Sequence, residues 1–211
     1  MLRRTWLKTV ATSALLALFA STTAQSTDEF GFVEGVEYKK IPQEQTIAPH
    51  KKQVTEVFYY GCSHCYNLEP SLHDWLKTKP ANVNFEQVPA VLDNPNWIFM
   101  AKVFYTAKEL GVIEQSHLPF FTALHRDRKS LFTVEEIATF FTQFRVEESD
   151  FIATFKSFKV DQLVRSAMRT TQAYGIEGVP AVIVNGKYLT DVPMAQSKDR
   201  MWQLVNVLTN K

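Results

Sequence analysis

The sequence contains two cysteines, Cys62 and Cys65, which stand three positions apart within residues 58–70, FYYGCSHCYNLEP. Two thiols at this spacing could form a structural disulfide, supply half of a metal site, or act as a redox reagent. A disulfide stabilises a fold chiefly by closing a long loop, and a loop of this length closes almost nothing. A zinc site needs two more ligands, and none of the five histidines has a paired, zinc-like spacing. The pattern therefore favours redox chemistry.

The cysteines come where a strand should end and a helix should begin. β-Branched and aromatic residues over 53–61 predict a buried strand, and a helix is expected over about 63–79. A helix N-terminus presents unpaired N–H groups and a positive dipole end, which stabilise an anion. We therefore expect Cys62 to have a lowered thiol pKa and to be the sulfur that attacks and is attacked. His64 can add a donor or a positive charge, and the more buried Cys65 is expected to be the resolving sulfur.

The N-terminus predicts export. Residues 1–24 hold three basic residues, a short apolar stretch and small residues suited to cleavage after Ala24, which is the pattern of a signal peptide. Removing it changes the formal net charge from +1 to −2 and leaves no basic patch, so nucleic acid is not an expected partner. Disulfides persist outside the cytoplasm, and a stabilised thiolate makes a disulfide more oxidising. An exported dithiol of this kind suits the transfer of disulfides to other proteins.

The pattern along the chain predicts a βαβ unit that includes the cysteines, then a helical block, a hairpin and a last helix. A short strand within 37–41 and another over 83–88 accompany the strand before the cysteines. From Asp93 the apolar residues recur at helical spacing, and Thr133 to Glu136 form a capping box. Eleven of the sixteen phenylalanines lie between positions 99 and 158, which indicates a helical subdomain with its own aromatic core.

The C-terminal part returns to a strand pattern. The residues AVIV (181–184) and KYL (187–189) flank Asn185-Gly186, which predicts two strands joined by a type I′ turn. A final helix is expected over about 195–209, with its apolar residues on one face.

Two segments together, EVFYYGCSHCYNLEP (56–70) and GIEGVPAVIVNGKY (175–188), resemble the thioredoxin superfamily and, within it, the DsbA-like disulfide oxidases. The resemblance implies an α/β, thioredoxin-like fold with an inserted helical subdomain. Residues 25–92 and 176–211 would form the thioredoxin-like domain, and residues 93–175 would form the insertion. The usual Pro-His between the cysteines of such oxidases is Ser63-His64 here, which keeps the histidine associated with strong oxidation and with the substrate-binding face.

The resemblance also assigns roles residue by residue. Pro180 matches the family's cis-proline, which packs against the active-site disulfide, and Val179 would pair its backbone with an extended substrate segment. Glu56 matches a buried acid beneath the thiols that handles the proton of Cys65, although the strand pattern alone favours a solvent-facing position for it. The family's lysine partner for this acid is absent, and Gln87 stands at the best-matching position.

These features predict an exported, monomeric disulfide oxidase of the periplasm that donates the Cys62–Cys65 disulfide to reduced, folding proteins. It would need no bound cofactor or metal, and the resemblance implies reoxidation by a membrane quinone-linked oxidase of the DsbB type. Two alternatives stay open. One is a thioredoxin-like reductase or isomerase, although no residues are left for the separate dimerisation domain that such isomerases usually carry. The other is a non-catalytic periplasmic chaperone or metal-binding module.

Overall fold

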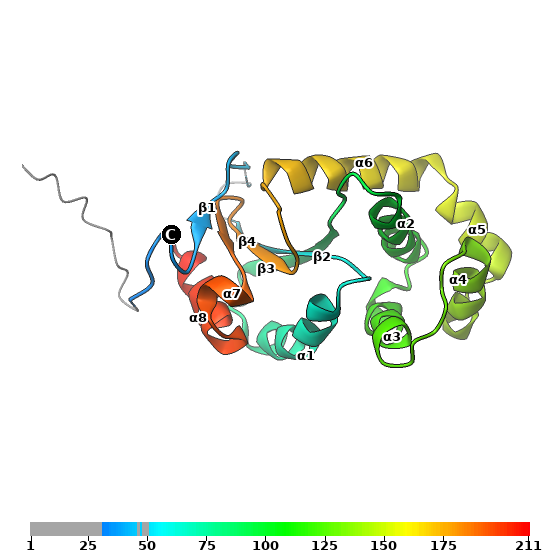
Figure 1. The fold of residues 1–211 in the computed structure, drawn as a ribbon, viewed down its shortest axis with the longest axis horizontal. Helices are drawn as coiled ribbons and strands as arrows, with labels where there is room; N and C mark the ends of the chain where they lie inside the picture. The colour runs from blue at the N-terminus through cyan, green and yellow to red at the C-terminus, as the bar shows by residue number, and fades with distance from the viewer. Residues whose placement is uncertain (1–30, 46, 48–50) are drawn as a thin grey trace, which may run out of the picture.

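The computed structural model describes residues 31–45, 47 and 51–211, so the predicted signal peptide over residues 1–24 lies outside the described part of the chain. A five-stranded sheet forms the framework (Figure 1). β2 pairs with β3 in parallel and with β4 in antiparallel orientation, and the remaining neighbours are antiparallel. In spatial order the strands are β1 (Lys39–Lys40), β5 (Tyr188–Thr190), β4 (Ala181–Val184), β2 (Lys52–Phe58) and β3 (Val83–Pro89).

The helix α1 (Ser63–Thr78) connects β2 to β3 and completes the predicted βαβ unit. β2 ends at Phe58, three residues earlier than the sequence pattern indicates. The reason is a turn, in which the backbone amide of Cys62 donates to the carbonyl of Tyr59 at 3.0 Å. The chain thus passes from sheet to helix within residues 59–62, and the cysteines stand at the predicted junction.

The predicted hairpin is confirmed, with β4 and β5 joined through Asn185 and Gly186. Both turn residues have positive φ angles, 53° and 59°, as a type I′ turn requires. The final helix expected over about 195–209 is present as α8 (Lys198–Leu208), and a short helix that the sequence pattern does not indicate, α7 (Val192–Ala195), precedes it. Between them Gln196 adopts the left-handed conformation, with φ of 69°, which ends α7 and lets Ser197 cap α8.

Helices cover both faces of the sheet (Figure 1). Side chains along β2 alternate between these faces, because successive residues of a strand point in opposite directions. Val54 packs among apolar residues of α1 and α8, whereas Val57 packs with residues that follow α6 (Phe158–Ala173), such as Tyr174. Glu56 and Phe58 share the face of Val54 by this alternation, so the acid predicted beneath the thiols faces the α1 side.

Most of the helices between β3 and β4 gather at one end of the molecule, and the last of them, α6, runs from that end back over the sheet (Figure 1). They are α2 (Pro95–Glu109), α3 (Ile113–His125), α4 (Val134–Phe141), the short 3-10 helix η1 (Thr142–Phe144), α5 (Glu148–Phe155) and α6. They fall within residues 93–175, and those two limits of the insertion stay a prediction. None of the helices in the described ranges is both long and apolar enough to cross a membrane.

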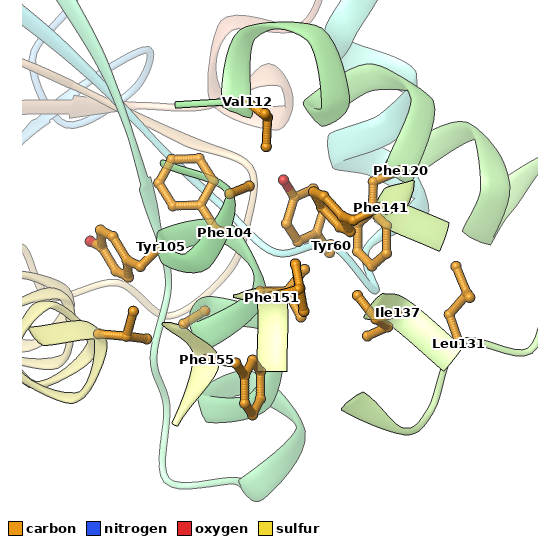
Figure 2. Packing of buried hydrophobic residues seen from close by; sticks show 14 of the residues in the cluster. Tyr60, Phe104, Tyr105, Val112, Phe120, Leu131, Ile137, Phe141, Phe151 and Phe155 are labelled. Carbon is orange, nitrogen blue, oxygen red and sulfur yellow. The ribbon is translucent and has the colours of Figure 1, made fainter. Parts of the chain in front are cut away.

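The helical block encloses the predicted aromatic core (Figure 2). Phe104, Phe120, Phe141 and Phe151 are buried together there, and Phe141 and Phe151 have ring centroids 4.6 Å apart. Residues near the cysteines join the same cluster, namely Phe58 of β2, Tyr60 of the following turn and Cys65 of α1. The inserted helices therefore pack directly onto the segment that carries the cysteines.

Sequence signals for these helices differ in strength. The capping box of α4 is present, with the Thr133 hydroxyl accepting from the Glu136 amide and the Glu136 carboxylate accepting from the Thr133 amide. In contrast, the sequence pattern does not indicate α3. Its N-cap residue, Val112, offers no side-chain cap, and Pro119 stands inside the helix. Packing onto its neighbours, rather than a local signal, defines this helix.

A pair of substitutions tests the aromatic core. Phe141 is 1% exposed and Phe132 is 76% exposed, although both belong to the same helical block. Phe141→Ala is expected to lower the free energy of unfolding by about 3–5 kcal/mol, because it removes a buried ring and leaves a cavity. Phe132→Ala is the matched control and should change it by less than about 0.5 kcal/mol. Denaturant unfolding measures both values, and equal effects would contradict the packing described.

Candidate active site

Cys62 occupies the N-cap position of α1. Its backbone is extended, with φ of −94° and ψ of 115°, and its sulfur accepts a hydrogen bond from the backbone amide of Cys65 at 3.4 Å. An N-cap acceptor satisfies one of the amides that a helix leaves unpaired at its start. The sulfur is half-buried, so an incoming thiol can reach it.

This position stabilises the Cys62 thiolate. Hydrogen bonds from the thiol of Cys65, then from the backbone amides of Cys65 and His64, together with the His64 ring, lower the pKa of Cys62 to about 6, although partial burial opposes them. The N-cap position of Cys62 agrees with the sequence-based expectation of a stabilised thiolate, and the catalytic roles of Cys62 and His64 stay a prediction. The His64 side chain is exposed beside the sulfur.

Cys65 is in the opposite situation. It is 0% exposed and lies within the aromatic core that the inserted helices share. Burial raises the pKa of its thiol far above the ordinary value, and the proximity of the Cys62 sulfur and of Glu56 adds to the effect. The two sulfurs thus differ sharply in how easily each carries a negative charge.

The loop before β4 lies against the first sulfur. The Val179–Pro180 peptide bond is cis, as the resemblance implied. The Cys62 sulfur is 3.4 Å from the carbonyl oxygen of Val179, to which the thiol form can donate. A groove of about 1020 Å³ opens beside this contact, lined by residues of α1, α3, α7 and residues 178–180. Leu118 of α3 lines it and is exposed, so the groove offers apolar as well as backbone contacts.

The turn before Cys62 is held by the inserted helix α3. His125 approaches the carbonyl oxygen of Tyr60 with its Nε2 at 2.7 Å, and because a carbonyl only accepts, this nitrogen donates. The His125 ring also stacks on Tyr66 of α1, with centroids 5.4 Å apart. At Gly61 a side chain would collide with the ring of Tyr59, since an added Cβ would lie 2.5 Å from it. The turn is therefore held by α3, and position 61 has no room for a side chain.

Glu56 is 0% exposed, so the buried position implied by the resemblance is correct and the solvent-facing one is not. It lies opposite Gln87 on β3 and opposite Val182 on β4. Its Oε1 has no hydrogen-bond partner among the described residues. Burial raises the pKa of Glu56 to about 8, helped by the proximity of Glu69 and the Cys62 sulfur, and opposed by the hydrogen bond from Gln87.

Glu56 belongs to a group of polar side chains enclosed between α1, β3 and α3. The Gln87 amide nitrogen lies 2.8 Å from Glu56 Oε2, 3.0 Å from His117 Nε2 and 3.4 Å from Glu69 Oε1. His117 continues the chain of contacts, with Nε2 3.3 Å from Glu69 Oε1 and Nδ1 2.8 Å from the Tyr60 hydroxyl. We call Glu56, Tyr60, Glu69, Gln87 and His117 the buried polar cluster.

The sequence reasoning missed three members of this cluster, Tyr60, Glu69 and His117. Glu69 had a usable signal, because it follows Cys65 by four positions on one helix and must therefore lie on the same face. No comparable signal points to His117, because α3 is not indicated by the pattern and its contact with β3 arises from packing. Within the described ranges, no three histidine, cysteine or acidic side chains are grouped so as to hold a metal ion.

Comparison with known proteins shows which family this chain matches. The model of the DSBA-like thioredoxin domain matches residues 53–209. Thiol:disulfide interchange protein DsbA of Azotobacter vinelandii is 34% identical over 200 residues, which cover 94% of this chain and 92% of that protein. The protein of the same name from Pseudomonas aeruginosa is 32% identical over 200 residues, or 94% of each chain.

Solved structures agree with these relatives. The crystal structure of Pseudomonas aeruginosa DsbA matches with a TM-score of 0.80 at 33% identity, over 86% of this chain and 95% of that chain. A complex of Proteus mirabilis DsbA with a non-covalently bound peptide, PWATCDS, matches with a TM-score of 0.72 at 25% identity, over 84% of this chain and 98% of that chain. The chain therefore belongs to the DsbA-like thioredoxin family, and it is a thiol:disulfide oxidoreductase.

Proposed function

We propose that this protein uses Cys62 and Cys65 to oxidise the thiols of other exported proteins. The single observation that carries the proposal is the contrast between the two sulfurs, one half-exposed with a pKa lowered to about 6 and one fully buried with a raised pKa. Stabilising the Cys62 thiolate stabilises the dithiol form, so the disulfide form gains electrons readily.

The exchange proceeds in two steps. A substrate thiolate attacks the Cys62 sulfur, the Cys62–Cys65 bond breaks, and its electron pair leaves on the Cys65 sulfur, which takes up a proton. The substrate's second thiolate then attacks the substrate sulfur of this mixed disulfide and releases Cys62 as a thiolate. The protein ends with two more electrons, and the substrate holds a new disulfide.

The proton for Cys65 has a nearby source in Glu56. A bare thiolate on the buried Cys65 sulfur would be costly, because burial penalises the charged form. Glu56 is buried too, and a pKa raised to about 8 keeps its carboxyl neutral at pH 7. A neutral acid beside a departing thiolate is a general acid, and Glu56 is proposed in that role.

Substrate binding is proposed at Val179, Pro180 and His64, which surround the reactive sulfur. The groove beside them combines exposed backbone near Val179 with apolar side chains, which suits an extended segment of an unfolded chain. The peptide bound to Proteus mirabilis DsbA contains a cysteine and supports a peptide ligand for this site.

The remaining parts of the proposal concern partners and place. A membrane quinone-linked oxidase of the DsbB type would remove the two electrons and restore the disulfide. The protein would work as a monomer in the periplasm, exported by residues 1–24, with reduced exported proteins as its substrates. The basic and apolar residues of the N-terminal sequence support export, and the name of the relatives, thiol:disulfide interchange protein, supports exchange with the thiols of other proteins.

The redox potential separates this function from a reductase. We expect equilibration with glutathione buffers to give the Cys62–Cys65 couple a potential of about −120 mV, the oxidising end of the range for such dithiols, because the thiolate is stabilised. A potential of about −270 mV would identify a thioredoxin-like reductant and would contradict the proposal.

Removal of each sulfur tests the order of events. Cys62→Ala is expected to abolish oxidation of a reduced, unfolded protein, since no accessible sulfur remains to be attacked. Cys65→Ser has no disulfide to give, but its Cys62 thiolate should attack a disulfide-containing substrate, release one substrate thiolate and accumulate mixed disulfides, because no Cys65 sulfur remains to displace the substrate. Non-reducing electrophoresis detects the trapped species, and cooperative unfolding of both variants confirms that they fold. Oxidation by the Cys62→Ala protein would overturn the mechanism.

The pH dependence of the dithiol form follows from the lowered pKa of Cys62. The thiolate should appear in ultraviolet absorbance with a midpoint near pH 6, and the Cys62→Ser variant should show no such transition. A lowered folded-state pKa adds stability that is fully present above the unfolded value, 9.0, and is lost as the pH falls through about 6. As the pH rises from about 6 to 9.0, the free energy of unfolding of the dithiol protein should therefore increase relative to that of Cys62→Ser. A constant difference would contradict the assignment.

A further inference from the structure

Proton positions in the buried polar cluster follow from its donors and acceptors. The Tyr60 hydroxyl is buried, and His117 Nδ1 at 2.8 Å is its only hydrogen-bond partner within the described ranges. A buried hydroxyl that donates to nothing costs about as much free energy as a lost hydrogen bond. Tyr60 is therefore best satisfied when it donates to Nδ1, which must then carry no proton.

The proton of the His117 ring then belongs on Nε2, since a neutral imidazole holds one proton. A second contact agrees with this tautomer. Glu69 Oε1 lies 3.3 Å from Nε2, and a carboxylate oxygen can only accept. Tyr60 on one side of the ring and Glu69 on the other thus select the same form of His117.

This tautomer acts on Gln87. The terminal group of Gln87 lies 3.0 Å from His117 Nε2 and 2.8 Å from Glu56 Oε2, and it can face both with its nitrogen or, after a half-turn, with its oxygen. When its nitrogen faces Glu56 and His117, the amide donates to an ionised Glu56. The same nitrogen then lies against the protonated Nε2 of His117, and two donors face each other without an acceptor. With its oxygen facing them, the amide accepts hydrogen bonds from His117 and from a neutral Glu56, and Glu69 Oε1, which lies 3.4 Å from this atom, keeps the Nε2 proton of His117 as its hydrogen-bond partner.

The two arrangements differ in how many groups are satisfied. When Glu56 is ionised, His117 must move its proton to Nδ1, and the Tyr60 hydroxyl then loses its acceptor. When Glu56 is protonated, Tyr60, His117 and Glu56 all donate to acceptors within the cluster. We propose that His117 is a positioning residue that turns the Gln87 oxygen toward Glu56 and so keeps Glu56 protonated for transfer to Cys65.

The inference rests on the proposed acid role of Glu56 and adds how its proton is held. In the first exchange step, the O–H bond of Glu56 breaks and an S–H bond forms on Cys65, as the sulfur–sulfur bond opens and the substrate sulfur bonds to Cys62. Glu56 then regains a proton from solvent. The side chains of Glu69 and His117 are 10% and 9% exposed, so the cluster meets water on their side.

Several charged or titratable groups face Glu56 from the packed elements. Glu69 and both cysteine sulfurs act on it from α1 and its N-cap, and β3 contributes the neutral Gln87, which His117 contacts from α3. The negative charges on Glu69 and Cys62 already favour a neutral Glu56. The hydrogen-bond arrangement acts in the same direction, because only a neutral Glu56 fits the amide orientation that His117 selects.

The first measurement uses the dithiol protein with ¹³C-labelled glutamate carboxyls and ¹⁵N-labelled histidine. We expect the pKa of the Glu56 carboxyl to lie above the value of about 8 that it has when Gln87 donates to it, and we expect His117 to carry its proton on Nε2. His117 with its proton on Nδ1 at pH 7 would overturn the inference. This measurement needs no substitution, so it decides even where a variant fails to fold.

Two variants of His117 isolate the contact with Gln87. The His117→Gln amide can reach the place of Nε2 and still donate to Gln87, so the Glu56 midpoint should stay close to its wild-type value. The His117→Asn side chain keeps a partner for Tyr60 but is too short for Gln87. Its Glu56 midpoint should fall by about 0.5–1 pH unit, the effect of one hydrogen bond. Equal midpoints in all three proteins would overturn the inference.

Tyr60→Phe tests whether the Tyr60 hydroxyl selects the His117 tautomer, and it leaves His117 itself unchanged. It removes the hydroxyl that selects the tautomer, so the Glu56 midpoint should fall, by less than in His117→Asn. Tyr105→Phe is the matched control, since Tyr105 is a buried tyrosine of α2 outside the cluster, and it should leave the midpoint unchanged. A purely structural role for Tyr60 predicts a loss of stability with no change of midpoint, and that result would contradict the proposal.

Glu56→Gln separates this inference from the proposed function. Loss of a general acid should slow single-turnover oxidation of a substrate peptide by roughly 100-fold or more at pH 7. If Glu56→Gln reacts at the wild-type rate, the acid role fails, and with it the use proposed for the held proton. If Glu56→Gln is slow but His117→Asn leaves the Glu56 midpoint unmoved, the acid role stands and the positioning role of His117 fails.

Discussion

The stabilisation of negative charge on the Cys62 sulfur is the interaction on which the rest of the site depends. It requires a sulfur at the N-cap of α1, where backbone amides converge and the buried Cys65 thiol can donate to it. The short turn from β2 provides that position, and His125 fixes the turn through the Tyr60 carbonyl. The disulfide form has no thiolate, so these hydrogen bonds stabilise only the dithiol form. The disulfide is therefore readily reduced by a substrate dithiol.

The inserted helices contribute more than a lid over the thioredoxin-like part. Their aromatic core includes Phe58, Tyr60 and Cys65. The last residue of β2 and the first turn of α1 therefore lie in a cluster that is formed largely by the insertion. Two histidines of α3 then contact Tyr60, His117 at its hydroxyl and His125 at its carbonyl. The reactive turn is therefore held from the side of the insertion. A substitution in α3 can therefore change the position of the turn before Cys62 through its contacts with Tyr60, even where the substituted residue contacts neither sulfur.

The parts of this structure that the sequence predicted are those with local causes. The place of Cys62 and Cys65 at a strand-to-helix junction and the Asn185-Gly186 turn follow from backbone rules that act over a few residues. The cis bond at Pro180 and the burial of Glu56 came from the resemblance, since a strand pattern cannot say which face an isolated acid occupies. The position of His117 was not predictable, because α3 has no strong start signal and its contacts cross about thirty residues to β3.

A neutral amide at Gln87 changes how the buried acid can be controlled. A lysine at this position would hold Glu56 ionised by charge, and its effect would not depend on how its hydrogens point. An amide has no charge and can face Glu56 as donor or acceptor, so the protonation of Glu56 depends on which face the neighbours select. With Glu69 and the Cys62 thiolate nearby, Coulomb repulsion already favours the neutral acid. His117 and Tyr60 then decide whether the hydrogen bonds support that preference or oppose it.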